Sequence, residues 1–296
     1  MGNAEQNHPA RRVLLATDLS ARCDRAFDRA VQLAQQWQAQ LIAVNVAENL
    51  QSPDMVLNWA YGDEEENLRI LRQQLREDAA DAEVPVDVRI VKGEPADSII
   101  GIAEQDGCEL IVTGMARSEP FGRFIVGTTV EKLVRQSRQP ILVVRKRPHG
   151  AYRNVVVATD FSQASALALR ATLELFPDQP IVLFHVVKQN LVELASEKTL
   201  PVVVDDELLA MVEAFYDAAG VSAEQRARIA LHVVGGRLES ALTQYVRQHG
   251  TDLAVIGSRG QNSVLAGLVG SSVSRLLQWL PCDTLITGAR QTEERT

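Results

Sequence analysis

A glycine-rich segment near residue 260 has the residue types that hold phosphate groups. It reads Gly257-Ser258-Arg259-Gly260, then nine residues, then Gly270-Ser271-Ser272. Glycine lets backbone N–H groups approach phosphate oxygens closely and readily adopts positive φ angles. Gly270 comes directly before an expected helix, whose unpaired N–H groups and dipole attract an anion at its start. We therefore expect this segment to bind phosphates, with the serine hydroxyls as additional donors.

An acidic residue, Asp160, is expected at the carboxyl end of a buried strand at 154–159. Ligands of open α/β sheets bind at the carboxyl ends of the strands, where the strand order reverses. Both features also have simpler interpretations, because Gly257 and Gly260 suit an ordinary turn and aspartate is a common helix N-cap. The full spacing together with Asp160 favours a ligand site, provided that the strand before Asp160 and the strand before Gly257 are neighbours.

The first half of the chain carries a degenerate version of the glycine segment. It reads Gly114-Met115-Ala116-Arg117, then nine residues, then Gly127-Thr128. Arg117 stands where the second glycine would be, so its side chain either blocks close backbone approach or places a cation in the pocket. Pro120 and Phe121 make the following loop stiffer and bulkier. We therefore expect the second half of the chain, rather than the first, to bind a phosphate-bearing ligand, one per chain.

An internal repeat decides the domain organisation. Residues 12–20 match 154–162, residues 110–114 match 253–257, and residues 127–128 match 270–271, all at nearly the same separation. A register kept over the whole length indicates a duplication. The two expected domains span residues 11–145 and 152–290, joined by a short linker.

Each copy alternates short apolar runs with helical patterns. The expected strands lie at 12–17, 40–46, 86–91, 109–113 and 140–144, and at 154–159, 181–187, 229–234, 252–257 and 284–287. Strands that alternate with helices predict a parallel sheet with helices on both faces, and continuous apolar strands fit a sheet buried on both sides. We predict an α/β fold with two tandem, open five-stranded sheets.

The glycine spacing, the residues 257–260 and 267–277 around it, and the opening run Val156-Val157-Ala158-Thr159-Asp160-x-Ser162 resemble those of the universal stress protein family, of the UspA-like, ATP-binding type. The resemblance covers about residues 12–145 and 153–288. It implies a Rossmann-like, HUP-type domain with strand order 3-2-1-4-5, and a site for ATP, with or without magnesium. The nucleotide-binding residues that it implies are Ala158, Thr159, Asp160, Val186, Gly257, Arg259, Gly260, Gly270, Ser271, Ser272 and Val273. Among these, Val186 would meet the adenine.

Composition limits the partners. The formal net charge is −8, which argues against nucleic acid, because phosphate neutralisation needs a basic surface. The three cysteines and five histidines are scattered without metal-ligand spacing, so we assign no metal site. The N-terminus does not resemble a secretory signal, and no apolar run approaches the roughly 18 residues that span a bilayer. These features predict a cytoplasmic protein.

Three functional classes remain after these exclusions. The leading expectation is a nucleotide-dependent stress-response or signalling module with little or no catalysis, since the chain has no G-x-x-x-x-G-K-[ST] motif and no evident catalytic constellation. The alternatives are a weak ATPase or nucleotidyl-transfer enzyme, and a protein-interaction scaffold with a vestigial nucleotide site. We assign no catalytic residue. His185 is interpreted as a core or pocket-edge histidine.

The last strand of each copy is an apolar edge. Residues 141–144 and 284–287 carry no charge that would protect them from aggregation. Single-domain members of the family dimerise through this strand, so the resemblance implies that the two domains of this chain pack through their last strands. The sequence leaves open whether whole chains then form a homodimer.

Overall fold

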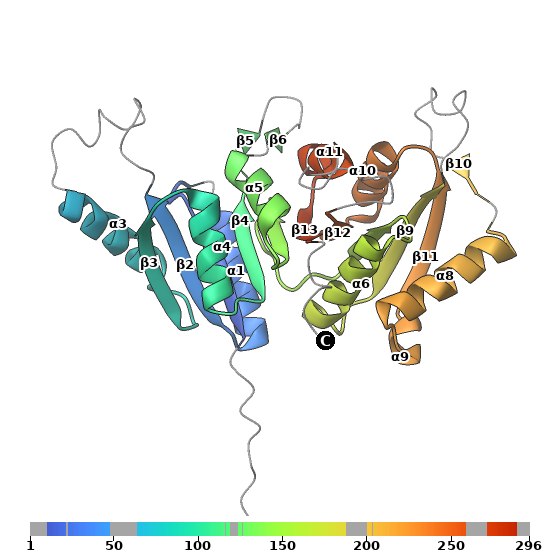
Figure 1. Cartoon of the computed structure of the whole chain (residues 1–296), viewed down its shortest axis with the longest axis horizontal. Coiled ribbons are helices and arrows are strands. Elements are labelled where there is room, and N and C mark those ends of the chain that lie inside the picture. Colours follow the sequence, from blue (N-terminus) through green and yellow to red (C-terminus); the bar gives the residue numbers. More distant parts are fainter. Residues whose placement is uncertain are drawn as a thin grey trace, which may run out of the picture. The chain divides into compact units, whose positions relative to one another are not determined.

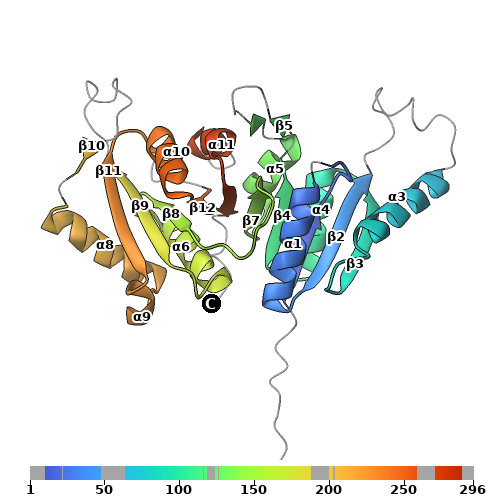
Figure 2. The same ribbon diagram turned by 180° about the vertical axis from the view of Figure 1, so that it is seen from behind.

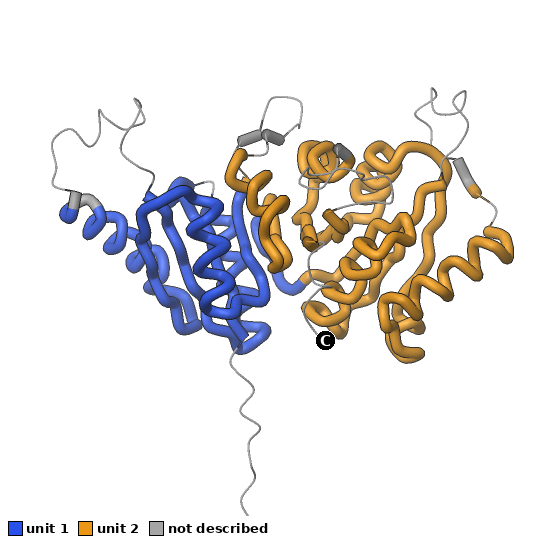
Figure 3. Tube along the Cα trace, in the orientation of Figure 1, with its two compact units in different colours: residues 1–114, 147–151 blue, residues 115–146, 152–296 orange. Residues whose placement is uncertain are grey.

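The structure, a computed structural model, describes residues 11–21, 23–47, 64–115, 117–118, 124–125, 127–187, 200–202, 204–258 and 271–288. The chain divides into two compact units (Figure 3). Unit 1 is Met1–Gly114 with Arg147–Ala151, and unit 2 is Met115–Lys146 with Tyr152–Thr296. The repeat boundaries at 11–145 and 152–290 therefore differ from the boundaries of the compact units, and they stay predictions from the sequence.

Unit 1 is a parallel sheet with helices on both faces. Its elements are β1 (Arg12–Ala16), α1 (Asp24–Trp37), β2 (Gln40–Ala47), α3 (Glu64–Asp78), β3 (Val86–Lys92), α4 (Pro95–Gln105) and β4 (Leu110–Gly114). The strands lie in the order β4-β1-β2-β3, and all neighbours are parallel. Helix α4 covers the face turned to the viewer in Figure 1, and α1 covers the opposite face, seen in Figure 2. The central strand β1 is fully buried from Val13 to Leu15, as the apolar pattern predicts.

Unit 2 contains the second repeat and the end of the first. Its elements are β5 (Arg117–Ser118), β6 (Phe124–Ile125), α5 (Thr128–Gln136), β7 (Ile141–Val144), β8 (Val155–Thr159), α6 (Gln163–Leu175), β9 (Ile181–Val187), β10 (Leu200–Pro201), α8 (Asp206–Ala219), α9 (Ala223–Arg226), β11 (Ile229–Gly235), α10 (Leu238–His249), β12 (Leu253–Gly257), α11 (Ser271–Trp279) and β13 (Asp283–Thr287). The main sheet of this unit has the order β10-β11-β9-β8-β12-β13-β7. Strands β5 and β6 form a separate antiparallel pair.

The strand order of the second repeat confirms the prediction. Counting from β8 as the first strand, the order β11-β9-β8-β12-β13 is 3-2-1-4-5, with parallel pairing throughout. The prediction of two separate five-stranded sheets is wrong. Strand β7, the last of the first repeat, pairs antiparallel with β13, so the sheet of unit 2 holds strands from both repeats. The physical reason is that two apolar edge strands bury each other by pairing.

Capping residues fix where the helices of unit 2 begin. Ser162 is the N-cap of α6, where its hydroxyl accepts a hydrogen bond from the Ser165 backbone N–H, and Asp205 caps α8 in the same way through Leu208. Gly220 ends α8 in the left-handed conformation that glycine adopts without strain. Within the described part of the chain, no helix has the length and apolarity that a membrane crossing requires.

Candidate functional site

Strands β8 and β12 are neighbours, which is the condition that the sequence left open. They pair in parallel, with Val155 opposite Leu253 and Val157 opposite Val255. Strand β9 lies on the other side of β8, so the strand order reverses between β8 and β12. Reversal points of this kind form ligand crevices at the carboxyl ends of the strands. Asp160 and Gly257 therefore lie at the same edge of the sheet, where the candidate site is expected.

The structure describes most, but not all, of the predicted site residues. Ala158, Thr159 and Val273 are buried, and Asp160, Val186, Gly257 and Ser272 are partly exposed. Ser271 is the first residue of α11, so a helix does begin directly after Gly270. Arg259, Gly260 and Gly270 lie outside the described residues, as do most residues of the glycine segment. The assignment of these side chains to a ligand stays a prediction.

A hydrogen-bonded turn carries Asp160. The Phe161 backbone N–H donates to the Thr159 hydroxyl at 2.9 Å, and the Ser162 N–H donates to Asp160 Oδ1 at 3.1 Å. The Thr159 hydroxyl in turn donates to Ser165 Oγ at 3.0 Å. The interpretation of Asp160 as the N-cap of the following helix is wrong, because Ser162 occupies that position. Asp160 instead stabilises the turn between β8 and α6.

His185 supports the same turn from the neighbouring strand β9. Its Nδ1 lies 2.9 Å from the carbonyl oxygen of Thr159, and because a carbonyl can only accept, Nδ1 carries the hydrogen. The imidazole also packs on the ring of Phe161, with centroids 4.3 Å apart and planes inclined by 31°. Burial lowers the pKa of His185, although the hydrogen bond to Thr159 and the charge of Asp160 act in the opposite direction. His185 is therefore a residue of the site's edge, neutral near pH 7.

Phe161 is a contact residue that the sequence analysis missed. Its φ of +59° is unusual for a residue with a side chain, and Leu19 at the matching position of the first repeat has φ +58°. The Phe161 ring also makes an edge-to-face contact with Phe215 of α8, at a centroid distance of 5.5 Å. A repeated bulky residue after Thr-Asp was visible in the sequence. Its left-handed backbone was not, because glycine usually marks such positions.

Gly257 is required by packing, independently of any ligand. A Cβ atom at this position would lie 2.8 Å from both the carbonyl carbon and the oxygen of Ala164, and 3.1 Å from Ser165 N. These are backbone atoms at the start of α6, which packs directly on β12. The glycine that the sequence attributes to phosphate binding thus allows a close approach between helix and strand.

The first repeat keeps a similar turn with different side chains. Asn45 donates from Nδ2 to the Thr17 carbonyl at 2.9 Å, the bond that His185 makes in the second repeat. Asp18 Oδ1 accepts from the Ser20 N–H at 2.9 Å and from Cys23 Sγ at 3.1 Å. Asp18 and Ser20 do not cap α1, because its N-cap is Cys23. The side chain of Arg117, which the sequence places in this repeat's glycine segment, lies outside the described residues.

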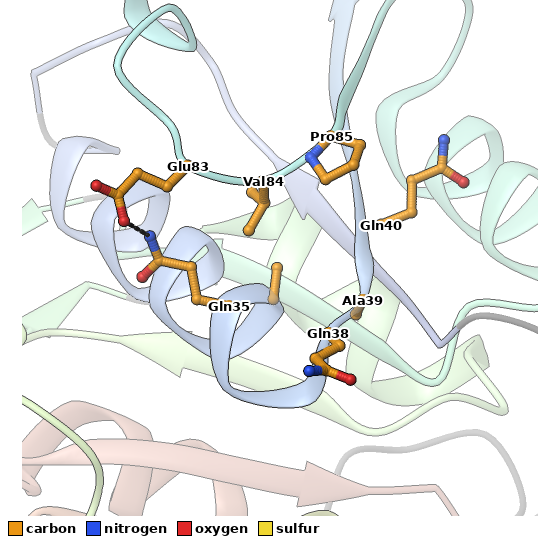
Figure 4. A pocket seen from close by; sticks show the side chains of 8 residues that line it. Gln35, Gln38, Ala39, Gln40, Glu83, Val84 and Pro85 are labelled. Carbon is orange, nitrogen blue, oxygen red and sulfur yellow. Dashed lines mark hydrogen bonds between the residues drawn. The ribbon is translucent and has the colours of Figure 1, made fainter.

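A cavity of about 480 Å³ lies in unit 1, at the end of the sheet opposite to the turn that carries Asp18. Gln35 and Gln38 at the end of α1, Gln40 at the start of β2, and Glu83 before β3 line it (Figure 4). Gln35 Nε2 donates to Glu83 Oε2 at 3.4 Å across this cavity. Because the lining residues precede β2 and β3, the cavity is at the amino ends of the strands. It is therefore separate from the turn that carries Asp18.

Comparison with known proteins identifies the family. The model of the universal stress protein family matches twice, at residues 9–145 and 151–288. The chain belongs to the universal stress protein family. The two matches cover nearly the whole chain, so the protein is of the tandem type that the repeat predicts.

The most similar relatives include proteins with one repeat and proteins with two. Universal stress protein YxiE of Bacillus subtilis is 30% identical over 146 residues, which are 45% of this chain and 98% of YxiE. A universal stress protein structure from Archaeoglobus fulgidus DSM 4304 is 18% identical, with a TM-score of 0.63 over 95% of this chain and 99% of its own. Another universal stress protein, 25% identical over 46% of this chain and 97% of its own, was crystallised in complex with cAMP, with a TM-score of 0.36. The Archaeoglobus fulgidus structure shows that the fold of both repeats is shared.

Proposed function

We propose that this universal stress protein binds ATP in its second domain and acts in the cytoplasm as a nucleotide-dependent stress-response or signalling module. One observation carries the proposal. Strand order reverses between β8 and β12, and this reversal brings Asp160 to the edge where β12 ends at Gly257. Helix α11 begins at Ser271, which directly follows the last glycine of the predicted phosphate-binding segment. A helix start of this kind suits a phosphate group.

The second repeat is the better candidate of the two for chemical reasons. Its glycine segment has a glycine at all three expected positions, whereas the first repeat has Arg117 in place of the second glycine. We therefore propose one nucleotide per chain. A measured stoichiometry near two would contradict this part of the proposal.

The decisive experiment compares two glycine variants by calorimetry with ATP. Gly270→Val adds a branched side chain where the phosphates are proposed to lie, so we expect loss of detectable binding. Gly127→Val is the matched control, because Gly127 stands at the corresponding position of the first repeat and has φ −70°, which valine adopts. We expect the control to keep the wild-type affinity. Unchanged binding in Gly270→Val, or equal loss in both variants, would overturn the assignment of the site to the second domain.

Mass spectrometry of freshly purified, denatured protein offers a second test. Retained adenine nucleotide supports the proposal, with cAMP, AMP, ADP and ATP distinguished by mass. If the purified protein carries no adenine nucleotide and binds no ATP in calorimetry, the result supports the alternative of a scaffold with a vestigial nucleotide site.

We propose that turnover is slow or absent. Phosphoryl transfer needs a positioned nucleophile and neutralisation of charge on the transferred group, usually with a metal ion. At the described edge, the carboxylate of Asp160 already accepts a hydrogen bond from the Ser162 N–H, in a role that supports the turn. A single-turnover assay with labelled ATP tests this. A rate above about 1 per second, in the usual range of phosphoryl-transfer enzymes, would favour the enzyme alternative.

A further inference from the structure

We propose that His185 is a positioning residue for Asp160. It holds the turn that carries this carboxylate mainly through one hydrogen bond, supported by one ring contact, and it thereby sets the affinity of the site. The first part stands on the geometry of the turn alone. The second part, on affinity, rests on the proposed nucleotide binding.

The geometry brackets Asp160 between two contacts to the same imidazole. Thr159, on one side of Asp160, accepts the hydrogen bond from His185 Nδ1 at 2.9 Å. Phe161, on the other side, packs its ring on the imidazole at 4.3 Å. His185 thus restrains the residues before and after Asp160 while belonging to a different strand, β9. Restraint from a neighbouring strand fixes the turn relative to the sheet, which the hydrogen bonds within the turn cannot do.

The turn needs this support because its backbone is uncommon. Phe161 has φ +59°, a region that residues with side chains seldom occupy unless their surroundings enforce it. Two aromatic neighbours hold Phe161 in this conformation by packing on its ring: His185 from β9 and Phe215 from α8. The partly exposed Asp160 follows the orientation of this backbone.

The first repeat makes the same hydrogen bond with a different donor. Asn45 on β2 donates to the Thr17 carbonyl at 2.9 Å, and Leu19, two residues after Thr17, has φ +58°. Histidine and asparagine share little beyond an N–H donor at similar reach. The bond therefore recurs with a different side chain. The ring contact occurs only in the turn of the second repeat, because the first repeat has Leu19 and Asn45 at the matching positions.

Two substitutions separate the donor from the ring. His185→Asn keeps a donor of the kind that Asn45 provides, and His185→Phe keeps an aromatic ring on Phe161 but has no donor. Without nucleotide, we measure amide hydrogen exchange at Phe161 and Ser162, whose N–H groups donate to Thr159 Oγ1 and Asp160 Oδ1. We expect faster exchange at both amides in His185→Phe and near-wild-type exchange in His185→Asn.

The second measurement is the dissociation constant for ATP by calorimetry. We expect His185→Phe to weaken binding about five- to tenfold, the effect of one lost hydrogen bond, and His185→Asn to stay within about twofold of the wild type. Asn45→Leu is the matched control in the first repeat, and it should leave the ATP affinity unchanged. His185→Leu serves as a second donor-free variant if the phenylalanine variant does not fold.

The outcomes separate this proposal from the proposed function. If wild-type protein binds no ATP, the nucleotide proposal fails, and hydrogen exchange alone then decides whether His185 positions the turn. Unchanged exchange in the donor-free variants would overturn the positioning role. Equal damage in the asparagine and phenylalanine variants would overturn the hydrogen bond as the main restraint, since this result indicates that the whole imidazole is needed.

Discussion

Burial controls the chemistry of the three cysteine thiols. It raises the pKa of Cys23 and of Cys108 to about 11 and that of Cys282 to about 12. Cys108 and Cys282 are buried, where free cysteine behaves as a small apolar residue. Cys23 is partly exposed and donates from Sγ to Asp18 at 3.1 Å, where the carboxylate also disfavours the thiolate. No thiolate is therefore expected near neutral pH.

The thiols should accordingly react slowly with alkylating reagents. At pH 8, a thiol with a pKa near 11 is ionised in roughly one molecule in a thousand, and the thiolate is the reactive form. We expect iodoacetamide to label the folded protein much more slowly than the urea-unfolded protein, with Cys23 labelled first because it is the least buried. Peptide mass spectrometry over time measures this. Rapid labelling of Cys282 in folded protein would contradict the structure.

The histidines of unit 2 predict a loss of stability in acid. Burial is the main cause that lowers the pKa of His185 and His232, and the charge of His249 lowers that of His232 further. The folded-state pKa is then below the unfolded value near 6.5, so the unfolded chain binds protons first as the pH falls. The histidine contribution to stability is complete above about pH 6.5 and is lost as the pH falls toward the folded-state values.

Urea unfolding at several pH values between 7.5 and 5.5 tests this expectation. The midpoint should fall with pH in the wild type and fall less steeply in a variant with both His185→Asn and His232→Asn. The comparison of slopes removes the constant effect of the substitutions themselves. Equal slopes in both proteins would assign the acid sensitivity to other groups.

At the scale of elements, close approach between α6 and β12 limits what residue 257 can be. Gly257→Ala places a Cβ 2.8 Å from backbone atoms of Ala164, so either the strand or the helix start must shift. We expect a loss of about 1–3 kcal/mol in the free energy of unfolding, typical of overpacking. Gly101→Ala in α4 is the control, because a Cβ there meets nothing within 4 Å. The control should gain about 0.5–1 kcal/mol, since alanine favours a helix interior over glycine.

Equilibrium urea unfolding of both alanine variants measures the two effects. A Gly257→Ala variant as stable as the wild type would show that the start of α6 can shift away from β12 at little cost in free energy. It would also return the glycine to a purely ligand-related explanation.

The elements were predictable because burial on both faces leaves a plain pattern. Continuous β-branched runs such as Val155-Val156-Val157 have one good solution, a central parallel strand, and the strand order of the second repeat followed from the family resemblance. The turn after β8 was not predictable, because the packing of Phe161, in this turn, on His185 joins the turn to a different element, β9. Sequence periodicity carries no signal for such a contact, and none for the positive φ of Phe161.

At the scale of the whole molecule, the repeats meet in the sheet of unit 2 through β7 and β13. The expected pairing of the two last strands is confirmed, with Val143 opposite Thr284 and Ile141 opposite Ile286. A buried carboxylate secures the chain just after this pair. Asp283 accepts from the backbone N–H groups of Arg145 and Lys146, at 2.8 and 3.0 Å, and from the Tyr152 hydroxyl at 2.7 Å. The linker is therefore held at both of its ends by the first residue of β13.

The role of Asp283 escaped the sequence analysis for a physical reason. An aspartate at the start of a strand suits a solvated turn, and nothing near it in sequence indicates burial. The three donors come from residues more than 130 positions away in the chain, as the separations of these bonds show. Hydrogen bonds between a buried carboxylate and donors so far away in the sequence can be recognised only once the arrangement of the strands is known.

The strand pair gives a test at this scale through Val143→Asp. Val143 is fully buried, and its register partner Thr284 is fully buried too, so the new carboxylate would be desolvated without a cation opposite it. Burying an unpaired charge costs several kcal/mol, so we expect a large fall in the urea midpoint or failure to fold. Val204→Asp makes the same chemical change at a residue that is 41% exposed, and should alter stability by less than about 0.5 kcal/mol. If Val143→Asp unfolds at the wild-type midpoint, the pairing of β7 with β13 does not stabilise the protein in solution.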